Sequence, residues 1–416
     1  MQIYFDAPEF DSQLLRTLSY TYYQGADLGD CLATVKHIKE RDFQSWHEKW
    51  FQTAERIYKG AEKALAEGHK ISAKEAFLRA SNYYRTSFFF LYDFPVDPLL
   101  YEAYEKHCLA FSKAISLFST HVEPIQIPYE NTSLPGYFYQ TDDPTSTKPV
   151  VIISNGYDGT HQEGYFIAGA AALARNYHVL CFDGPGQGEM LIKKNFYMRY
   201  DWEKVITPAV DYLLSRADVD PKRIALIGPS WGGYLAPRAA AFEHRIAALV
   251  ANPGQFDAMN SIRRAFPHID ELLTNDPEHL LGRYLSQAML NPLFAAKIRA
   301  KMWIHGVESP VELFRIWQSY TLSSVVKQIK CPTLVMDAEN EPLSTGQAKV
   351  LFEQLSCPKD YILFTAKEGA GEHCQAGALS YANERLFDWL DKVFLAFSPL
   401  RKDSEITEKV NEIKER

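Results

Sequence analysis

Residues 223–241 read RIALIGPSWGGYLAPRAAA: an apolar run, a G-x-S-x-G motif and a run of small residues. The apolar run over 223–227 predicts a buried strand, and the small residues over 234–241 predict a helix. Ser230 stands on the tight turn between them, where larger neighbours would clash with the strand and the helix. The helix N-terminus adds oriented N–H groups for developing negative charge. Because a bare G-x-S-x-G is common by chance, its strand-and-helix setting is what favours a nucleophile over a structural turn.

Further apolar runs alternate with helical segments on both sides of this motif. Strands are predicted over residues 149–154, 178–182, 246–251, 333–336 and 361–365. A hairpin of two short strands, 125–129 and 134–139, is expected around the turn at Asn131. Apolar strands separated by helices indicate an α/β fold, with a mostly parallel sheet and helices on both faces.

The residues before these strands are helical and rich in aromatic side chains. One amphipathic helix is predicted from about 45 to 67 and ends at Gly68, and another is predicted to begin with Ser72 as its cap. No repeat of about 34 residues is sustained, which favours a single helical domain over a tetratricopeptide array. Aromatic stripes usually form core, and the alternative is that Tyr84 and Phe88 line a pocket for a flat substrate.

These patterns divide the 416 residues into three parts. Residues 1–122 form the helical domain, 123–396 the α/β domain and 397–416 a charged tail. Between two of the strands, a helical stretch over about 255–326 is far longer than an ordinary connection. We expect it to cap the carboxyl ends of the strands, and the alternative is a packing extension.

Composition argues against several classes of function. A net charge of −8 disfavours nucleic acid and anionic membranes as partners. The sequence contains no run of about 20 apolar residues, so a membrane-spanning helix is not expected. The N-terminus lacks the basic start and apolar stretch of a secretory signal. The six cysteines show no close pairing, which is typical of reduced thiols in a cytoplasmic protein. We expect a small-molecule substrate and neither a cofactor nor a metal.

A serine nucleophile needs a base, and the base needs an acid that orients it. In hydrolases with this strand–turn–helix motif the chain order is serine, acid, histidine. Of the twelve histidines, only His373 follows the predicted strand 333–336. It stands in a glycine-containing loop before a helix, where an imidazole can reach the strand ends. His373 is therefore the expected base, and a loop histidine without a role is the alternative.

Three acidic residues after strand 333–336 compete for the role of orienting acid. Glu341 is favoured because it stands just before Pro342. Glu339 and Asp337 remain alternatives, although Glu339 also fits a solvated position and Asp337 a turn that ends the strand. Glutamate has one methylene more than aspartate, so its loop must retreat slightly to hold the imidazole at hydrogen-bond distance.

Acyl transfer also needs donors for an oxyanion. The backbone N–H of Trp231, directly after the serine, is one candidate. The N–H of Tyr157 is the other, since Gly156 lets the loop after strand 149–154 turn toward the site; an ordinary glycine-rich turn is the alternative. The nearby stretch 183–189, DGPGQGE, lacks the Lys-Ser/Thr of a P-loop and the G-x-G-x-x-G spacing. It is predicted to be a structural turn beside the site.

Together these segments resemble one branch of the α/β-hydrolase superfamily. The branch includes 2,6-dihydroxypseudooxynicotine hydrolase and the fungal hydrolases that shorten polyketides in naphthalene-pigment pathways. The resemblance covers nearly the whole chain and rests on residues 25–30, 155–159, 182–189 and 228–241. It implies hydrolysis of a carbon–carbon bond next to a ketone, in a polyketide-like or aromatic substrate, without a cofactor. It also implies a helical cap and often a homodimer.

The chain departs from that branch at two places. Glu341 stands where an aspartate is commoner, and residues 252–255 read NPGQ where a Gly-Gly pattern is expected. A carboxylesterase or an oligopeptidase-like hydrolase is the alternative among enzymes, although related peptidases usually carry a β-propeller. A non-catalytic binding protein on the same fold is the alternative from another class. The complete set of serine, acid and histidine in order argues against it.

Overall fold

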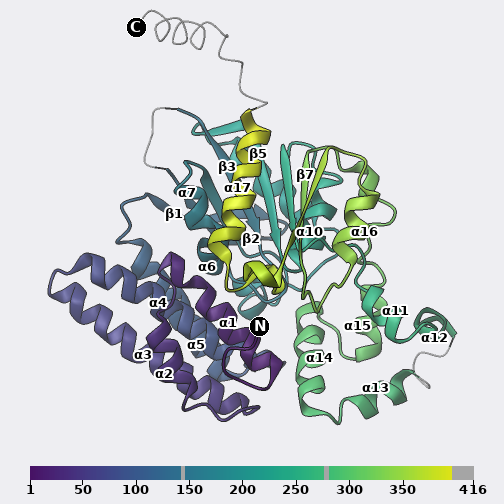
Figure 1. The fold of residues 1–416 in the computed structure, drawn as a ribbon, viewed down its shortest axis with the longest axis horizontal. Coiled ribbons are helices and arrows are strands. Elements are labelled where there is room, and N and C mark those ends of the chain that lie inside the picture. Colours follow the sequence, from purple (N-terminus) through teal and green to yellow (C-terminus); the bar gives the residue numbers. More distant parts are fainter. Residues whose placement is uncertain (142–145, 276–280, 396–416) are drawn as a thin grey trace, which may run out of the picture.

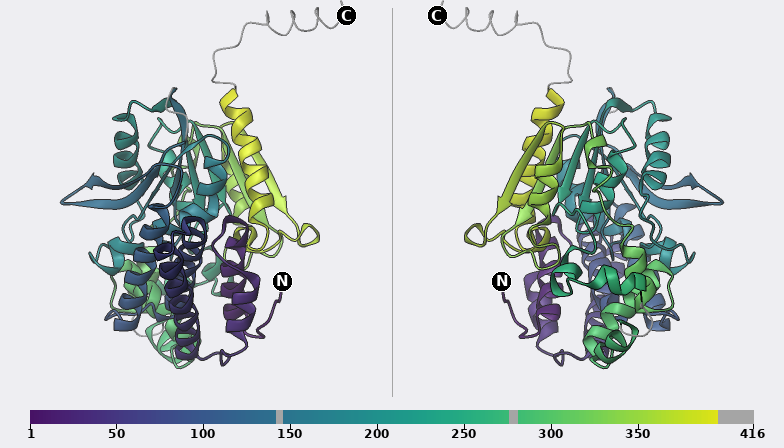
Figure 2. Two further views of the ribbon diagram at one scale, coloured as in Figure 1. Left: turned by 90° about the vertical axis from the view of Figure 1, so that its left-hand side faces the viewer. Right: turned by 90° about the vertical axis from the view of Figure 1, so that its right-hand side faces the viewer.

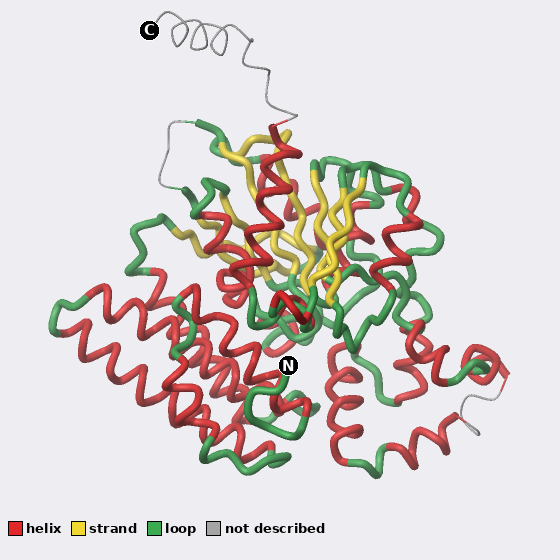
Figure 3. Tube along the Cα trace, viewed as in Figure 1, coloured by secondary structure: helices red, strands yellow, loops and turns green. Residues whose placement is uncertain are grey.

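The computed structural model describes residues 1–141, 146–275 and 281–395, and the predicted charged tail over 397–416 lies outside these ranges. Figure 1 shows a central sheet with two groups of helices below it, one from the N-terminal residues and one from an insertion. Figure 3 shows the same division by secondary structure, with the yellow strands above the two red helical groups.

The predicted mostly parallel sheet is confirmed. Its eight strands lie in the order β1-β2-β4-β3-β5-β6-β7-β8, and only the pairings of β2 with β1 and with β4 are antiparallel. The hairpin predicted around Asn131 is β1 and β2. The strand bounds are β1 Val122–Tyr129, β2 Thr132–Tyr139, β3 Lys148–Ser154, β4 His178–Phe182, β5 Val219–Pro229, β6 Ala248–Asn252, β7 Thr333–Ala338 and β8 Lys359–Phe364.

Helices cover both faces of this sheet, as expected for strands with continuous apolar runs. Along β3, Val150 and Ile152 pack in one core with α9, α10 and α16, whereas Val151 and Ile153 pack in a second core with α7 and α17. Figure 2 turns the molecule by 90° and shows the yellow α17 along one side of the strands. The helix bounds are α6 His161–Gly164, α7 Ala170–Leu173, α8 Gly188–Ile192, α9 Glu203–Leu214, α10 Gly232–Ala240, α16 Gln347–Gln354 and α17 Leu379–Leu395.

The N-terminal helices pack around aromatic side chains. Trp46, Trp50 and Tyr83 are fully buried among them. The change from helix to sheet falls between Ile115, where the last of these helices ends, and Val122. The bounds are α1 Pro8–Ser19, α2 Leu28–Val35, α3 Phe43–Ala66, α4 Lys70–Phe88 and α5 Pro98–Ile115.

The predicted start of the second long helix is wrong. Gly68 ends α3 with a positive φ of 85°, as expected, but α4 already begins at Lys70, so Ser72 lies inside it. The N–H of His69 donates to the carbonyl of Ala64 (2.8 Å), and the carbonyl of His69 accepts from the N–H of Ala73 (2.9 Å). The tight turn therefore leads straight into the next helix and leaves no room for a separate cap at Ser72.

The long connection between β6 and β7 is helical, as predicted. Its helix α14 lies beside the N-terminal helices on the same side of the sheet (Figure 1). Lys297 and Arg299 of α14 form ion pairs with Glu9 (2.6 Å) and Asp93 (2.7 Å). No helix in the described ranges is both long and apolar enough to cross a membrane. The bounds are α11 Asn260–Ala265, α12 Ile269–Asn275, α13 Gly282–Ala288, α14 Pro292–His305 and α15 Pro310–Trp317.

Candidate active site

Ser230 stands on a strained turn between β5 and α10. Its φ is +56°, in the left-handed region that residues other than glycine rarely adopt, and its N–H donates to the carbonyl of Asn252 (2.6 Å). A Cβ added to Gly233 would overlap the carbonyl oxygen of Pro253, so the turn requires glycine there. The 252–255 segment that departs from the related branch thus packs directly against this turn.

A chain of hydrogen bonds joins Ser230 to His373 and His373 to Glu341. The Nε2 atom of His373 lies 2.9 Å from Oγ of Ser230, and its Nδ1 lies 2.6 Å from Oε2 of Glu341. A carboxylate only accepts hydrogen bonds, so Nδ1 carries the proton that it donates to Glu341. In the neutral ring Nε2 is then left to accept from the hydroxyl of Ser230.

Of the three candidate acids, only Glu341 forms a hydrogen bond with His373 in the described part of the chain. Its Oε1 accepts from the N–H groups of Leu343 (2.9 Å) and Ser344 (3.1 Å), which fixes the side chain below the imidazole. Glu339 accepts from a backbone N–H in the loop after β8, and Asp337 accepts from the hydroxyl of Tyr361 (2.8 Å). Glu341 thus lies at hydrogen-bond distance from the imidazole with its longer side chain.

The surroundings of this pair shift both pKa values toward the charged forms. Burial alone would raise the pKa of Glu341, but its hydrogen bond from His373 and those from the backbone hold it below its ordinary value. Burial alone would lower the pKa of His373, but the neighbouring sulfur of Cys374 and the carboxylate of Glu341 raise it well above that of a free histidine. The carboxylate of Glu341 therefore stabilises the imidazolium that forms when His373 takes a proton.

The loop after β3 approaches Ser230 closely. A Cβ added to Gly156 would lie 2.8 Å from Cβ and 3.2 Å from Oγ of the serine. The ring of the next residue, Tyr157, packs edge-on against Trp231, with the two centroids 5.5 Å apart. Neither the N–H of Tyr157 nor that of Trp231 has a hydrogen-bond partner among the described residues. The N–H groups of Tyr157 and Trp231, the two predicted donors, thus lie next to the serine without a hydrogen-bond acceptor among the described residues.

The turn over residues 183–189 lies beside this loop, as predicted, and one of its side chains holds the loop. The amide of Gln187 donates to the carbonyls of Asn155 (2.7 Å) and Gly156 (2.8 Å) and accepts from the N–H of Gly184 (3.0 Å). Asp183 fastens the same turn by accepting from the N–H groups of His161 and Glu189. The sequence shows a glutamine in a glycine-rich turn, but nothing in it identifies the two carbonyls that the amide binds.

Comparison with known proteins establishes the family. Residues 150–378 match the sequence profile described as the alpha/beta hydrolase family. Hydrolase LUC6 of a Fusarium species is 34% identical over 409 residues, which cover 94% of this chain and 97% of that protein. This chain belongs to the alpha/beta hydrolase family. It is therefore an enzyme of the hydrolase class, and the resemblance drawn from its motifs is confirmed.

Other relatives of this hydrolase extend over nearly its whole length. The 20-hydroxy-prefusarin hydrolase FUS2 of Gibberella moniliformis is 34% identical over 404 residues, covering 92% of this chain and 96% of that protein. The crystal structure of 2,6-dihydroxy-pseudo-oxynicotine hydrolase superposes with a TM-score of 0.73 at 21% identity, covering 92% of this chain and 97% of that one. The shared architecture thus includes the N-terminal helices.

Tyr84 and Phe88 are both buried in the core, the position that the usual interpretation of an aromatic stripe gives them. The hydroxyl of Tyr84 donates to Glu55 (2.6 Å) within the N-terminal helices. Phe88 packs against Tyr92 and Tyr104. Among the described residues, no hydrogen bond or ring contact joins either side chain to Ser230, His373 or Glu341. Helix packing alone accounts for both positions.

The aromatic rings beside the candidate site come instead from the insertion. The ring of His305, at the end of α14, packs against Tyr157 with centroids 5.5 Å apart. Tyr320, just after α15, packs against both Trp231 (5.6 Å) and His305 (5.2 Å). The insertion therefore reaches the two residues predicted as oxyanion donors. Within the described ranges, no group of three or more metal-ligating side chains is present.

Proposed function

We propose that this enzyme is a cofactor-independent serine hydrolase that uses Ser230, His373 and Glu341 as a triad. The observation that carries the proposal is the pair of hydrogen bonds from Ser230 to His373 and from His373 to Glu341, at 2.9 and 2.6 Å. This is the arrangement in which an imidazole takes the proton of a serine as the serine attacks a carbonyl.

In the proposed reaction Oγ of Ser230 attacks a carbonyl carbon while Nε2 of His373 takes its proton. The N–H groups of Trp231 and Tyr157 stabilise the resulting oxyanion. His373, now an imidazolium held by Glu341, gives the proton to the leaving group as the tetrahedral intermediate collapses. Water, deprotonated by the same imidazole, then releases the acid from the serine.

We propose a small molecule with a carbon–carbon bond next to a ketone, polyketide-like or aromatic, as the substrate. Cleavage of such a bond expels an enolate or a similarly stabilised carbanion, which the imidazolium protonates. The raised pKa of His373 suits this proton donation. The rings of Tyr157, Trp231 and Tyr320 suit a flat conjugated ketone, and relatives named hydrolases of 20-hydroxy-prefusarin and of 2,6-dihydroxy-pseudo-oxynicotine support the assignment.

Side-by-side assays test the bond that is cleaved. The purified enzyme is given an aryl ester, a peptide amide and a 1-phenyl-1,3-diketone, each also with Ser230→Ala. We expect kcat/KM to be highest for the diketone, with products showing cleavage between its carbonyl groups. Turnover of the ester alone would make the protein a carboxylesterase with the same triad, and turnover of the amide alone would make it a peptidase.

The contacts of Gln187 predict a specific loss of turnover on substitution. The carbonyl of Gly156 and the N–H of Tyr157 belong to one planar peptide group, so the amide that binds the carbonyl also sets the direction of the N–H. Gln187→Met keeps the side-chain length and removes all three hydrogen bonds of the amide. We expect kcat to fall by about 10- to 100-fold, with KM changed much less. Steady-state kinetics on the preferred substrate measure this change.

Gln140→Met is the matched control, because Gln140 donates to Asp218 at a distance from the site. This variant is expected to keep its kcat. A folded Gln187→Met enzyme with an unchanged kcat would contradict the role of Tyr157 as an oriented donor.

A further inference from the structure

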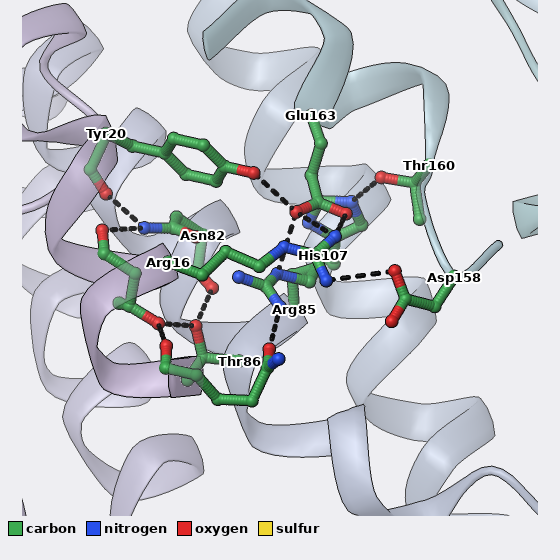
Figure 4. Close-up of polar contacts among 12 residues, drawn as sticks. Arg16, Tyr20, Asn82, Arg85, Thr86, His107, Asp158, Thr160 and Glu163 are labelled. Atoms are coloured by element: carbon green, nitrogen blue, oxygen red, sulfur yellow. Dashed lines mark hydrogen bonds and ion pairs between the residues drawn. The ribbon is translucent and has the colours of Figure 1, made fainter. Parts of the chain in front are cut away.

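A buried cluster of charges joins the N-terminal helices to the loop beside Ser230 (Figure 4). Arg16 of α1 donates through Nη1 to Oδ1 of Asp158 (2.9 Å) and through Nη2 to both oxygens of Glu163 (2.9 and 3.1 Å). Asp158 directly follows Tyr157 in the loop, and Glu163 lies in α6 just beyond it. One guanidinium thus holds two points of the segment that carries the proposed oxyanion donor.

The position of Arg16 is fixed by the partners of Glu163. The carboxylate of Glu163 is only 1% exposed, accepts from the hydroxyl of Tyr20 (2.9 Å) and forms an ion pair with the equally buried Arg85 (3.1 Å). Burial alone would raise the pKa of Glu163, but the two arginines hold it below its ordinary value. Arg16 is therefore held by two charge-assisted hydrogen bonds to a carboxylate that is itself fixed in the interior.

Because Glu163 already orders Arg16, the partly exposed ion pair between Arg16 and Asp158 forms at a low cost in entropy. Such pairs usually contribute little because two flexible side chains must be ordered to form them. The side chain of Asp158 is 34% exposed, but Arg16 is already ordered by Glu163. Holding Asp158 therefore costs only the freedom of one short side chain.

A second contact from the helices fixes the far end of the loop. Nε2 of His107 lies 3.0 Å from Oγ1 of Thr160, and Nδ1 lies 2.9 Å from the carbonyl of Ser81. Burial lowers the pKa of His107 to about 4, so the ring is neutral and donates from Nδ1, and the hydroxyl of Thr160 donates to Nε2. The carbonyl of Thr160 accepts from the amide of Asn155 (2.7 Å), which closes the loop on itself.

The peptide N–H of Tyr157 thus lies between two residues, Gly156 and Asp158, that are each held by a hydrogen bond. Gln187 holds the carbonyl of Gly156 on one side, and Arg16 holds the side chain of Asp158 on the other. We propose that Arg16 acts through Asp158 as a positioning residue for this donor, which makes the N-terminal helices part of the catalytic apparatus. The inference rests on the proposed serine hydrolase mechanism and adds a determinant of its rate.

A double-mutant cycle on the full-length enzyme tests this inference. Asp158→Asn keeps the shape of the side chain and removes its charge. Arg16→Lys keeps a cation for Glu163, but a single ammonium cannot span both carboxylates. We expect each variant to lower kcat by on the order of 10-fold, with KM and the acid limb of the pH profile little changed. The double variant should have a kcat within about 3-fold of the less active single variant, because both substitutions weaken the same charge-assisted hydrogen bond.

Glu62→Gln is the matched control. It removes the carboxylate of an ion pair between α3 and α5, Glu62 with Lys113 (2.8 Å), without touching the loop. This variant should keep its kcat whatever it does to thermal stability. If it loses turnover in step with Asp158→Asn, the helices act through stability alone and the inference fails.

Two further outcomes would overturn the inference in different ways. Independent effects of the two substitutions, which multiply in the double variant, would mean that Asp158 acts on the substrate directly. A wild-type rate in Asp158→Asn would mean that the loop keeps its shape without Arg16. Both leave the labelling of Ser230 by a fluorophosphonate intact, whereas failure of the proposed function would show as a wild-type enzyme that does not label.

Discussion

Replacing Ser230 by alanine is expected to abolish covalent labelling by a fluorophosphonate probe and to lower kcat by about 10⁶-fold. The hydroxyl of Ser230 lies 2.9 Å from Nε2 of His373, which leaves it poised to lose its proton as it attacks the probe. Alanine keeps the backbone N–H that donates to Asn252, so the variant should fold. Intact-mass spectrometry after incubation with the probe measures the adduct directly.

Ser215→Ala is the control for this experiment. Ser215 is exposed, its hydroxyl donates to the carbonyl of Tyr212, and it has no histidine partner among the described residues. That variant should label at the wild-type rate. An adduct that persists in Ser230→Ala would place the nucleophile elsewhere, and a folded wild-type protein that does not label would contradict the serine mechanism altogether.

Glu341→Gln is expected to lower kcat by about 10⁴-fold, as a change of tautomer does in related triads. Oε1 of Glu341 accepts from the N–H groups of Leu343 and Ser344, so the amide oxygen of glutamine will occupy that position. Its NH₂ group then faces Nδ1 of His373 and donates to it. The ring proton is forced onto Nε2, which can no longer accept the proton of Ser230.

The same substitution is expected to move the acid limb of the pH–rate profile. His373 must be neutral to act as a base, and the carboxylate of Glu341 contributes to raising its pKa well above that of a free histidine. The wild-type acid limb should therefore lie above the pKa of a free histidine. Removing the carboxylate lowers the pKa of His373, so the limb of Glu341→Gln should shift to lower pH.

Glu339→Gln and Asp337→Asn are the controls, since these residues were the other candidates for the acid. Glu339 accepts from the N–H of Ala366 and Asp337 from the hydroxyl of Tyr361, so each should change kcat by no more than about 3-fold. If Asp337→Asn is as inactive as Glu341→Gln, the orienting acid has been misassigned.

The sequence predicted the strands well because a strand buried on both faces leaves a continuous apolar run. It failed where polar residues join the sheet. β5 was expected over 223–227, but it begins at Val219, and its ladder with β3 is interrupted by an irregularity near Val150. The polar stretch Asp220–Arg223 gives no apolar signal. Its place in the sheet depends on backbone pairing with a distant strand.

The candidate site was predictable to the extent that chain order constrains it. The order of serine, acid and histidine selected His373. Which of Asp337, Glu339 and Glu341 lies at hydrogen-bond distance from it depends on the conformation of the folded loop. Gln187 and Arg16 carry no local signal for these contacts, because the carbonyls that Gln187 binds and the carboxylates that Arg16 binds are 31 to 147 residues away in the chain. Only the packing of distant segments identifies such contacts.

The shared carboxylate of Glu163 also bears on how such enzymes can be divided or recombined. A shortened chain that began at residue 123 would retain Glu163 but lose both Arg16 and Arg85, the cations that balance it. Apolar side chains that now pack against the removed helices, such as Tyr137 and Phe166 beside Phe111, would also be exposed to water. The α/β portion is therefore not an autonomous module. A chimera that exchanges N-terminal segments between relatives must keep Arg16 and Arg85 together with Glu163.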